Sequence, residues 1–184
     1  MEIEELGIRG CWLSYSPIHL DNRGNFREWF RAESLENSLG RGFEVRQANL
    51  SVSHKDTIRG IHFSKSKGGQ GKWVTCASGS IWDVVVDIRP TSSTFGKWIS
   101  VELSADSGHS LFISEGLGHG FLALEETSVV VYLLNSQYSP QEEFGINPLD
   151  LDLAISWPTK NPIISNKDAS APGFNSIFPS RENS

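Results

Sequence analysis

The middle of the chain is a succession of short apolar runs in which polar residues alternate with branched and aromatic ones, and clusters of Gly, Pro, Ser and Asp separate the runs. This rhythm is typical of antiparallel strands joined by tight turns, so it predicts a β-sandwich or β-barrel. The strands are expected at residues 45–52, 57–63, 72–76, 80–88, 98–103, 110–114 and 128–134.

The run 80–88 divides its side chains between two faces, because successive residues of a strand point in opposite directions. Trp82, Val84 and Val86 share a plainly apolar face, whereas Asp83 and Asp87 lie on the other.

One helix is predicted, at residues 32–39. Leu35 and Leu39 are four residues apart and therefore lie on one stripe, and Gly40 provides a left-handed stop. Residues 161–184 contain three prolines and little periodicity, which predicts an irregular segment with 173–184 as a tail. A chain of 184 residues without a repeat or linker suits one hydrophobic core, so we expect a single domain over 1–184.

The formal net charge of -6 argues against a general nucleic-acid-binding protein, since neutralising a phosphate backbone requires clustered Lys and Arg. The two cysteines have no CxxC spacing, and the N-terminal residues lack the features of a signal peptide, which predicts the cytoplasm. No run approaches the roughly 18 apolar residues of a membrane-spanning helix.

Polar side chains interrupt several strand-like runs, which suggests a polar barrel interior, because burial without a partner costs free energy. Gln47 and Asn49 face one side, either as ligand-binding amides or as a buried hydrogen-bonded pair. Gln70 and Lys72 repeat this spacing. Lys72 is either a solvated lysine at a strand edge or a fixed cation for a phosphate or a developing oxyanion.

Two histidines stand where chemistry is plausible, although each also suits a satisfied core residue. In the run Arg59-Gly60-Ile61-His62, a bulge at Gly60 would bring Arg59 and His62 into one cavity, whereas a regular strand would point them apart. His119 lies in a predicted glycine-rich turn at 115–120, where glycines allow close backbone approach.

The surroundings of these histidines disfavour a metal centre. Metal-binding cupin barrels use an HxH pair, a carboxylate and a later histidine, but Phe63 and Ser64 follow His62. Only two plausible ligands remain where a catalytic site usually has three, so we expect no metal.

Tyr132 shares a strand face with Val130 and Leu134, where a phenol either donates a proton or simply fills the interior. Asp168, next to Lys167, has the chemistry to orient His62 and stabilise its protonated form. Sequence spacing alone cannot place Asp168 near His62.

Several blocks follow one another in a fixed order: DNRGNFRE at 21–28, QANLS at 47–51, RGIHF at 59–63, QGK at 70–72, DVVVDIR at 83–89, STFGKW at 93–98, HGF at 119–121, YSPQEE at 138–143, SWP at 156–158 and SNKD at 165–168. Each is weak alone, but these ten motifs in one order make coincidence a poor explanation. From about Leu6 to Pro172 the chain resembles the dTDP-4-dehydrorhamnose 3,5-epimerase family.

This resemblance implies a metal-free cupin-type jelly-roll barrel without a cofactor, usually a homodimer, that acts on a dTDP-linked 4-keto-6-deoxy sugar. The implied reaction inverts C3 and C5 of dTDP-4-dehydro-6-deoxy-glucose and gives dTDP-4-dehydro-rhamnose for deoxysugar biosynthesis. The chemistry is consistent, because a C4 ketone acidifies the hydrogens of C3 and C5 and the resulting negative charge needs a pre-positioned cation.

The resemblance also assigns roles to residues. His62 is the general base, Tyr132 the acid that returns a proton from the opposite face, Lys72 the group that stabilises the enolate, and Asp168 the support of His62. Tyr138 stacks on thymine, and the N-terminal segment reaches the site of the partner chain. The implied substrate-binding residues are Arg23, Phe26, Glu28, Gln47, Asn49, Arg59, Lys72, His119, Tyr138, Glu143 and Lys167.

Three alternatives stay open. Relatives that invert only C3 retain the same His, Lys and Tyr positions. A metal-dependent cupin isomerase or oxygenase is disfavoured by the missing HxH pair. A non-catalytic nucleotide-sugar-binding cupin is disfavoured by the joint presence of His62, Lys72 and Tyr132.

Overall fold

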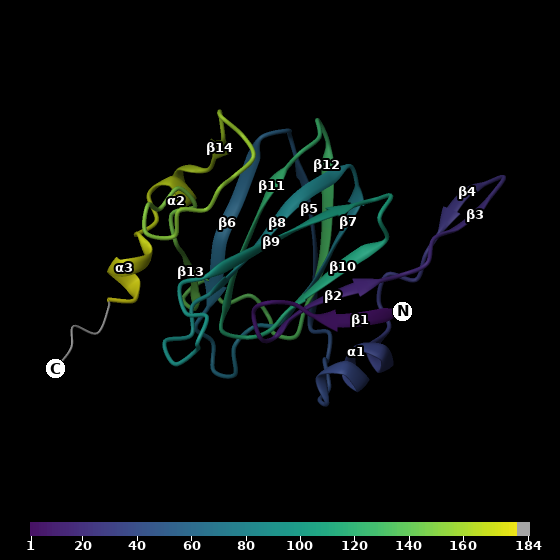
Figure 1. The fold of residues 1–184 in the computed structure, drawn as a ribbon, viewed down its shortest axis with the longest axis horizontal. Coiled ribbons are helices and arrows are strands. Elements are labelled where there is room, and N and C mark those ends of the chain that lie inside the picture. The colour runs from purple at the N-terminus through teal and green to yellow at the C-terminus, as the bar shows by residue number, and fades with distance from the viewer. Residues whose placement is uncertain (180–184) are drawn as a thin grey trace.

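The computed structural model describes residues 1–179 and contains two large β-sheets packed face to face (Figure 1). The first sheet has the strand order β1 (Glu2–Glu5), β2 (Cys11–Tyr15), β10 (His109–Ile113), β7 (Lys72–Ser78), β12 (Ser128–Leu134) and β5 (Gln47–Ser53). The second has the order β13 (Glu143–Gly145), β6 (Thr57–Ser64), β11 (Leu117–Ala123), β8 (Ser80–Asp87) and β9 (Trp98–Ser104), and β14 (Ile163–Ile164) adds to β6. Only the pairing of β14 with β6 is parallel among these described strands, so the predicted antiparallel architecture is confirmed.

The main core lies between the sheets. Val74 and Val130 of the first sheet pack in one cluster with Val85 and Phe121 of the second. All four are at most 5% exposed, as expected for the facing sides of a sandwich.

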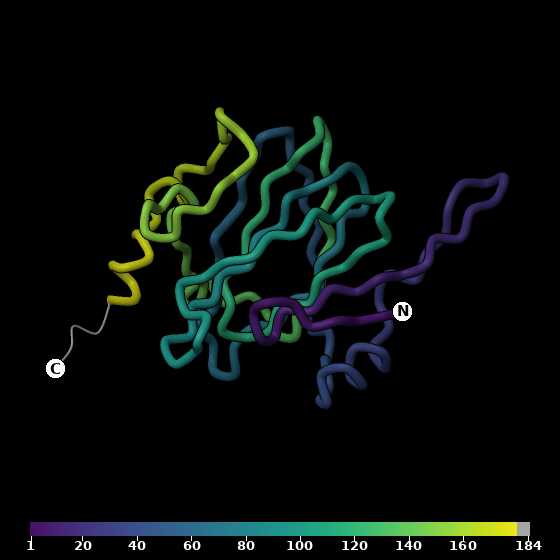
Figure 2. Tube along the Cα trace, in the orientation of Figure 1, coloured from purple at the N-terminus to yellow at the C-terminus, as the bar shows by residue number. Residues whose placement is uncertain are grey.

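The outer face of the second sheet is covered by the C-terminal part of the chain, which Figure 2 shows as the yellow-green segment beside β6. Trp157 packs against Trp82, and Phe174 of α3 (Phe174–Ile177) is buried against Phe95. Strand β8 is thereby buried on both faces. The segment expected to be irregular therefore holds short ordered elements, including α3 within the expected tail 173–184, of which residues 180–184 lie outside the described part.

Part of the outer face of the first sheet is covered by helix α1 (Ala32–Leu39), whose bounds agree with the prediction. Leu35 is fully buried in a cluster with Phe43, Trp73 and Phe112. Gly40 adopts a φ of 68° and donates its N–H to the carbonyl of Glu36, which ends the helix in the predicted left-handed conformation.

The predicted turn at 115–120 is wrong in part, because Leu117–Ala123 forms the central strand β11. This strand contains glycines because the Ile61 side chain of the neighbouring strand packs against it. A Cβ at Gly118 or Gly120 would lie 2.8 Å from the Ile61 side chain. The expected close approach is therefore real, but it serves packing inside a sheet.

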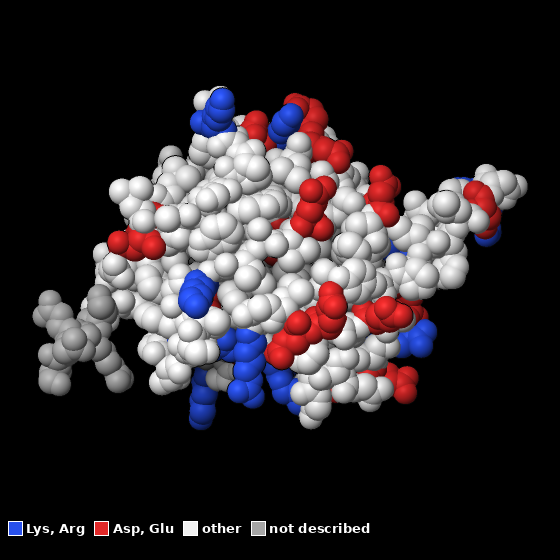
Figure 3. All heavy atoms as spheres, in the orientation of Figure 1, with Lys and Arg blue, Asp and Glu red and all other residues white. Residues whose placement is uncertain are grey.

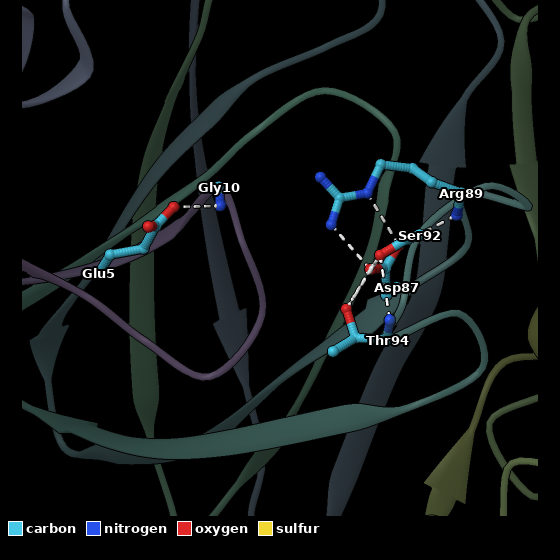
Figure 4. A network of polar contacts seen from close by, with 6 residues as sticks. All are labelled: Glu5, Gly10, Asp87, Arg89, Ser92 and Thr94. Atoms are coloured by element: carbon cyan, nitrogen blue, oxygen red, sulfur yellow. Dashed lines mark hydrogen bonds and ion pairs between the residues drawn. The ribbon is translucent and has the colours of Figure 1, made fainter.

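The turn after β8 is organised by Asp87, whose side chain is fully buried (Figure 4). Its carboxylate accepts hydrogen bonds from the Arg89 guanidinium at 2.7 and 2.8 Å, from the Ser92 hydroxyl at 2.5 Å and from the Thr94 hydroxyl at 2.6 Å. Burial alone would raise the pKa of Asp87, but these donors lower it to about 2.

The exposed apolar side chains of residues 1–179 include those of a projecting hairpin and of the outer face of β5. The hairpin of β3 (His19–Asp21) and β4 (Gly24–Phe26) projects away from the sheets, with Leu20 80% and Phe26 70% exposed (Figure 1). On the outer face of β5, Leu50 is 64% and Val52 54% exposed.

Charge on the molecular surface follows the net charge of -6. In Figure 3, Lys and Arg gather mainly at the lower edge of the view while acidic side chains are spread over its right half, so no basic stripe crosses this face. Among residues 1–179 no helix combines the length and apolar character needed to cross a membrane.

Candidate active site

A cavity of about 490 Å³ opens on the inner faces of the two sheets, and most predicted catalytic residues line it. It receives side chains from β5, β6, β7, β11 and β12 and from the segment that carries α2 (Asn166–Ala169). Its polar lining consists of Ser51, Thr57, Arg59, His62, Lys72, His119, Tyr132, Ser165, Lys167 and Asp168.

His62 and Asp168, 106 residues apart in sequence, form a hydrogen-bonded pair with Nε2 and Oδ1 2.7 Å apart. The parallel pairing of β14 with β6 brings α2 to this place, and the Ser165 hydroxyl caps α2 by accepting the Asp168 N–H. Burial tends to raise the pKa of Asp168, yet the hydrogen bond and charge of His62, with hydrogen bonds from the Ser165 side chain and the Gly60 backbone, keep it below its usual value. Asp168 therefore faces His62 as a carboxylate.

Arg59 and His62 both line the cavity, as a bulge at Gly60 was predicted to allow. The register of β6 against β11 shifts between the pairs His62–His119 and Arg59–Phe121. Gly60 has a φ of 128°, and a Cβ there would lie 2.5 Å from Gly120 Cα, so the irregularity requires glycine.

Lys72 is 7% exposed and lies at the start of β7 with its side chain in the cavity, which excludes the solvated-lysine interpretation. Burial lowers the pKa of Lys72, while the negative charges of Glu143 and Asp83 act in the opposite direction. Two nearby carboxylates therefore favour the charged form of this buried amine.

His119 is 8% exposed and pairs with the fully buried Asp83, whose carboxylate oxygens lie 2.8 and 3.0 Å from Nε2. His119 is also the cross-strand neighbour of His62. Asp83 is a functional candidate that the sequence reasoning missed. The available signal was a carboxylate on the same strand face as Ile81 and Val85, which a buried partner had to satisfy.

Tyr132 projects into the cavity from β12 of the first sheet, whereas His62 projects from β6 of the second. The base and acid candidates therefore approach a bound molecule from opposing sheets.

A narrower cavity of about 160 Å³ adjoins the first and shares His62, Lys72, Tyr132 and Lys167 with it. Gln47 and Asn49 line it and are hydrogen-bonded to each other at 2.9 Å, and the binding of a ligand by these amides stays a prediction. Gln47 Oε1 also accepts the backbone N–H of Tyr138 at 2.7 Å. Gln70 Nε2 donates to Glu143 Oε1 at 3.1 Å.

Three predicted substrate-binding residues lie away from both cavities of their own chain. Arg23 is paired with Asp21 at the tip of the projecting hairpin, and Phe26 belongs to the same hairpin. Glu28 is paired with Arg31.

No three His, Cys, Asp or Glu side chains within residues 1–179 come together in an arrangement suited to a metal ion. Each of the two cavity histidines is instead paired with a single carboxylate.

The family model of dTDP-4-dehydrorhamnose 3,5-epimerase matches residues 5–176. The dTDP-4-dehydrorhamnose 3,5-epimerase of Mycobacterium tuberculosis is 44% identical over 180 residues, which cover 96% of this chain and 89% of that protein. The solved structure of the M. tuberculosis epimerase has a TM-score of 0.94 and covers 98% of this chain and 92% of its own. This likeness confirms the cupin-type fold.

The names of other relatives differ in whether one carbon or two are inverted. The dTDP-4-dehydro-6-deoxyglucose 3-epimerase of Streptomyces bikiniensis is 43% identical over 168 residues, covering 91% of this chain and 86% of that protein. The 3,5-epimerase of Legionella pneumophila, solved in complex with dTDP-4-keto-L-rhamnose, is 36% identical with a TM-score of 0.90 and covers 100% of this chain and 99% of its own. The chain thus belongs to the dTDP-4-dehydrorhamnose 3,5-epimerase family, as the order of its motifs predicts, and is an epimerase of dTDP-sugars.

Proposed function

We propose that the protein inverts C3 and C5 of dTDP-4-dehydro-6-deoxy-glucose and releases dTDP-4-dehydro-rhamnose. One observation carries this proposal: His62 and Tyr132 line the same cavity from opposing sheets. Inversion requires that a proton leave one face of a carbon and another arrive on the opposite face. A base and an acid on facing sheets meet that requirement.

In this mechanism Asp168 fixes the tautomer of His62. A carboxylate accepts hydrogen bonds but donates none, so Nε2 carries the hydrogen that joins the pair and Nδ1 keeps its lone pair. Nδ1 is then the atom that removes the proton next to the C4 ketone, and Asp168 stabilises the imidazolium that forms.

Lys72 and Tyr132 complete the reaction. Removal of the proton leaves an enolate with negative charge on the C4 oxygen, and the Lys72 ammonium stabilises that charge in a site shielded from water. The Tyr132 hydroxyl then delivers a proton to the carbon from the first sheet. His62 and Tyr132 are restored to their starting protonation states by exchange with solvent.

The nucleotide is expected in the narrower cavity, where Tyr138, 58% exposed, presents its ring for stacking on thymine. Arg59, His119 and Lys167 supply cationic or hydrogen-bonding groups for the diphosphate. We further propose a homodimer in which Arg23, Phe26 and Glu28 reach the partner's site. The exposed apolar face of β5 and the projecting hairpin support this assembly.

The cytoplasm is the expected location, since Cys11 and Cys76 are buried and unpaired.

The decisive experiment incubates the protein with dTDP-4-keto-6-deoxyglucose in D₂O and follows deuterium at C3 and C5 by NMR. Exchange at both carbons supports the proposal. Folded protein that exchanges the hydrogen of neither carbon would refute the catalytic interpretation. The matched variant is His62→Asn, which we expect to slow exchange by about 10²- to 10⁴-fold while still binding dTDP.

Inversion of C3 alone is the second candidate, and the identity of 43% to a 3-epimerase favours it specifically. The same experiment separates the two functions, because a 3-epimerase would incorporate deuterium at C3 only.

A further inference from the structure

Strand β5 presents an alternating row of polar side chains toward the interior: Gln47, Asn49, Ser51 and Ser53. Three of them have protein partners, since Gln47 and Asn49 bond to each other and the Ser53 hydroxyl accepts Arg59 Nε at 3.0 Å. The Ser51 hydroxyl has no hydrogen-bond partner although it is buried from water.

Ser51 differs in position from the other unpartnered buried hydroxyls of the described chain, which belong to Ser14, Ser16 and Ser66. It is the one member of this group that lines the 490 Å³ cavity. Its cross-strand neighbour is Val130, so it lies one diagonal step from Tyr132 on the same face of the sheet.

A buried hydroxyl without a partner costs free energy in the unliganded protein. Rotation about the Cα–Cβ bond moves the oxygen between staggered positions, and the residue already lines the cavity. A ligand hydroxyl or carbonyl there would supply the missing hydrogen bond.

We propose that Ser51 is a substrate-binding residue whose hydroxyl hydrogen-bonds an oxygen of the sugar ring or its substituents, and this inference rests on the proposed function. The position of Ser51 along β5 favours a contact with the sugar and not with the base. Asn49 and Gln47 lead away from Ser51 into the narrower cavity with Tyr138, whereas Ser51 lines only the larger cavity, one diagonal step from the proposed acid Tyr132. A neutral hydroxyl, which both donates and accepts, suits a sugar oxygen better than it suits a diphosphate, which attracts cations.

The test is Ser51→Ala, with Ser14→Ala as the matched control. Ser14 resembles Ser51 in having a buried, unpartnered hydroxyl on a strand, but it lies outside both cavities. For Ser51→Ala we expect kcat/KM for dTDP-4-keto-6-deoxyglucose to fall about 3- to 10-fold, the loss typical of one neutral hydrogen bond. The melting temperature should not fall, and the Kd of dTDP alone, measured by calorimetry, should stay within about twofold. Ser14→Ala should match the wild type in turnover.

Three results would overturn the inference. The first is turnover by Ser51→Ala equal to that of Ser14→Ala. The second is a loss of dTDP affinity as large as the loss of kcat/KM, which would place the contact on the nucleotide. The third is a lowered melting temperature, which would reveal a structural partner of the hydroxyl. Failure of the proposed function is distinguishable, because the wild type itself would then show no deuterium exchange.

Discussion

Asp83 acts on the site through charge, and its consequences are visible at the scale of single residues. It bonds His119 and also lies close enough to Lys72 to favour the charged amine. Burial lowers the pKa of Lys72, and the negative charges of Glu143 and Asp83 oppose that effect and favour the ammonium form.

The substitution Asp83→Asn should therefore lower the pKa of Lys72 further and move the alkaline limb of the kcat/KM profile to lower pH. The sign follows because the charged amine, which stabilises the enolate, would be lost at a lower pH than in the wild type. We expect kcat/KM at neutral pH to fall about 10-fold, the effect of losing one charge-assisted hydrogen bond. The pH–rate profile measures this shift.

Asp106→Asn is the control for this change, because Asp106 is exposed in the turn after β9 and the substitution removes the same charge from the chain. An alkaline limb that moves equally in both variants would assign the effect to overall charge and contradict a specific role of Asp83.

At the scale of elements, the buried carboxylate of Asp87 ties the turn after β8 to the end of its strand. Asp87→Ala leaves the Arg89 guanidinium and two hydroxyls without their acceptor, so the free energy of unfolding should fall by about 3 kcal/mol. Urea denaturation followed by fluorescence measures the difference.

The stabilisation by Asp87 should also depend on pH. Its pKa is about 2 in the folded protein and about 3.9 in an unfolded chain, so its contribution is complete above the unfolded value and declines as the pH falls toward 2. The stability difference between wild type and Asp87→Ala should shrink over that range. A difference that stays constant from pH 5 to about pH 2.5 would mean that the carboxylate is not the source of the stability.

The elements themselves differ in how far the sequence predicts them. Strand β12 and helix α1 were predicted with the bounds that the structure has, because a continuous apolar run or a helical stripe ended at a clear turn former. Strand β11 was missed because two glycines close together, Gly118 and Gly120, are typical of a turn. Glycine is needed at both positions because the Ile61 side chain packs against them, and Ile61 is close in space but distant in sequence. The short strands near the N-terminus lack an alternating pattern and depend on pairing partners for their form.

The residues of the candidate site also differ in how far the sequence predicts their positions. Lys72 and Tyr132 stood in strands whose inward faces the alternation identifies. The pairing of His62 with Asp168 was beyond sequence reasoning, since a two-residue parallel strand and a four-residue helix position the aspartate. The family resemblance supplied roles, but the residues alone left both histidines compatible with core positions.

At the scale of the whole molecule, the projecting hairpin separates Arg23, Phe26 and Glu28 from the cavity of their own chain. If the partner's site receives them, a chain with a defective hairpin and a chain with a defective cavity can complement each other in one dimer. A heterodimer of an Arg23→Ala chain with a His62→Asn chain then contains one intact site, formed by the unaltered His62 of one chain and the unaltered hairpin of the other.

We expect such a heterodimer, purified through two different affinity tags, to have about half of the wild-type activity, while each homodimeric variant is far less active. Sedimentation of the wild type provides the control for assembly. A heterodimer no more active than the variants would place the hairpin's role within its own chain and contradict the exchange.

The pairing of β14 with β6 has a consequence for the timing of activity during synthesis. His62 leaves the ribosome early, but its partner carboxylate is made 106 residues later, after all the described strands of both sheets, including β14, have been synthesised. A nascent chain can therefore form its two-sheet core and still lack the group that orients its base. If Asp168 orients His62 as proposed, we expect catalytic competence only after translation has passed α2.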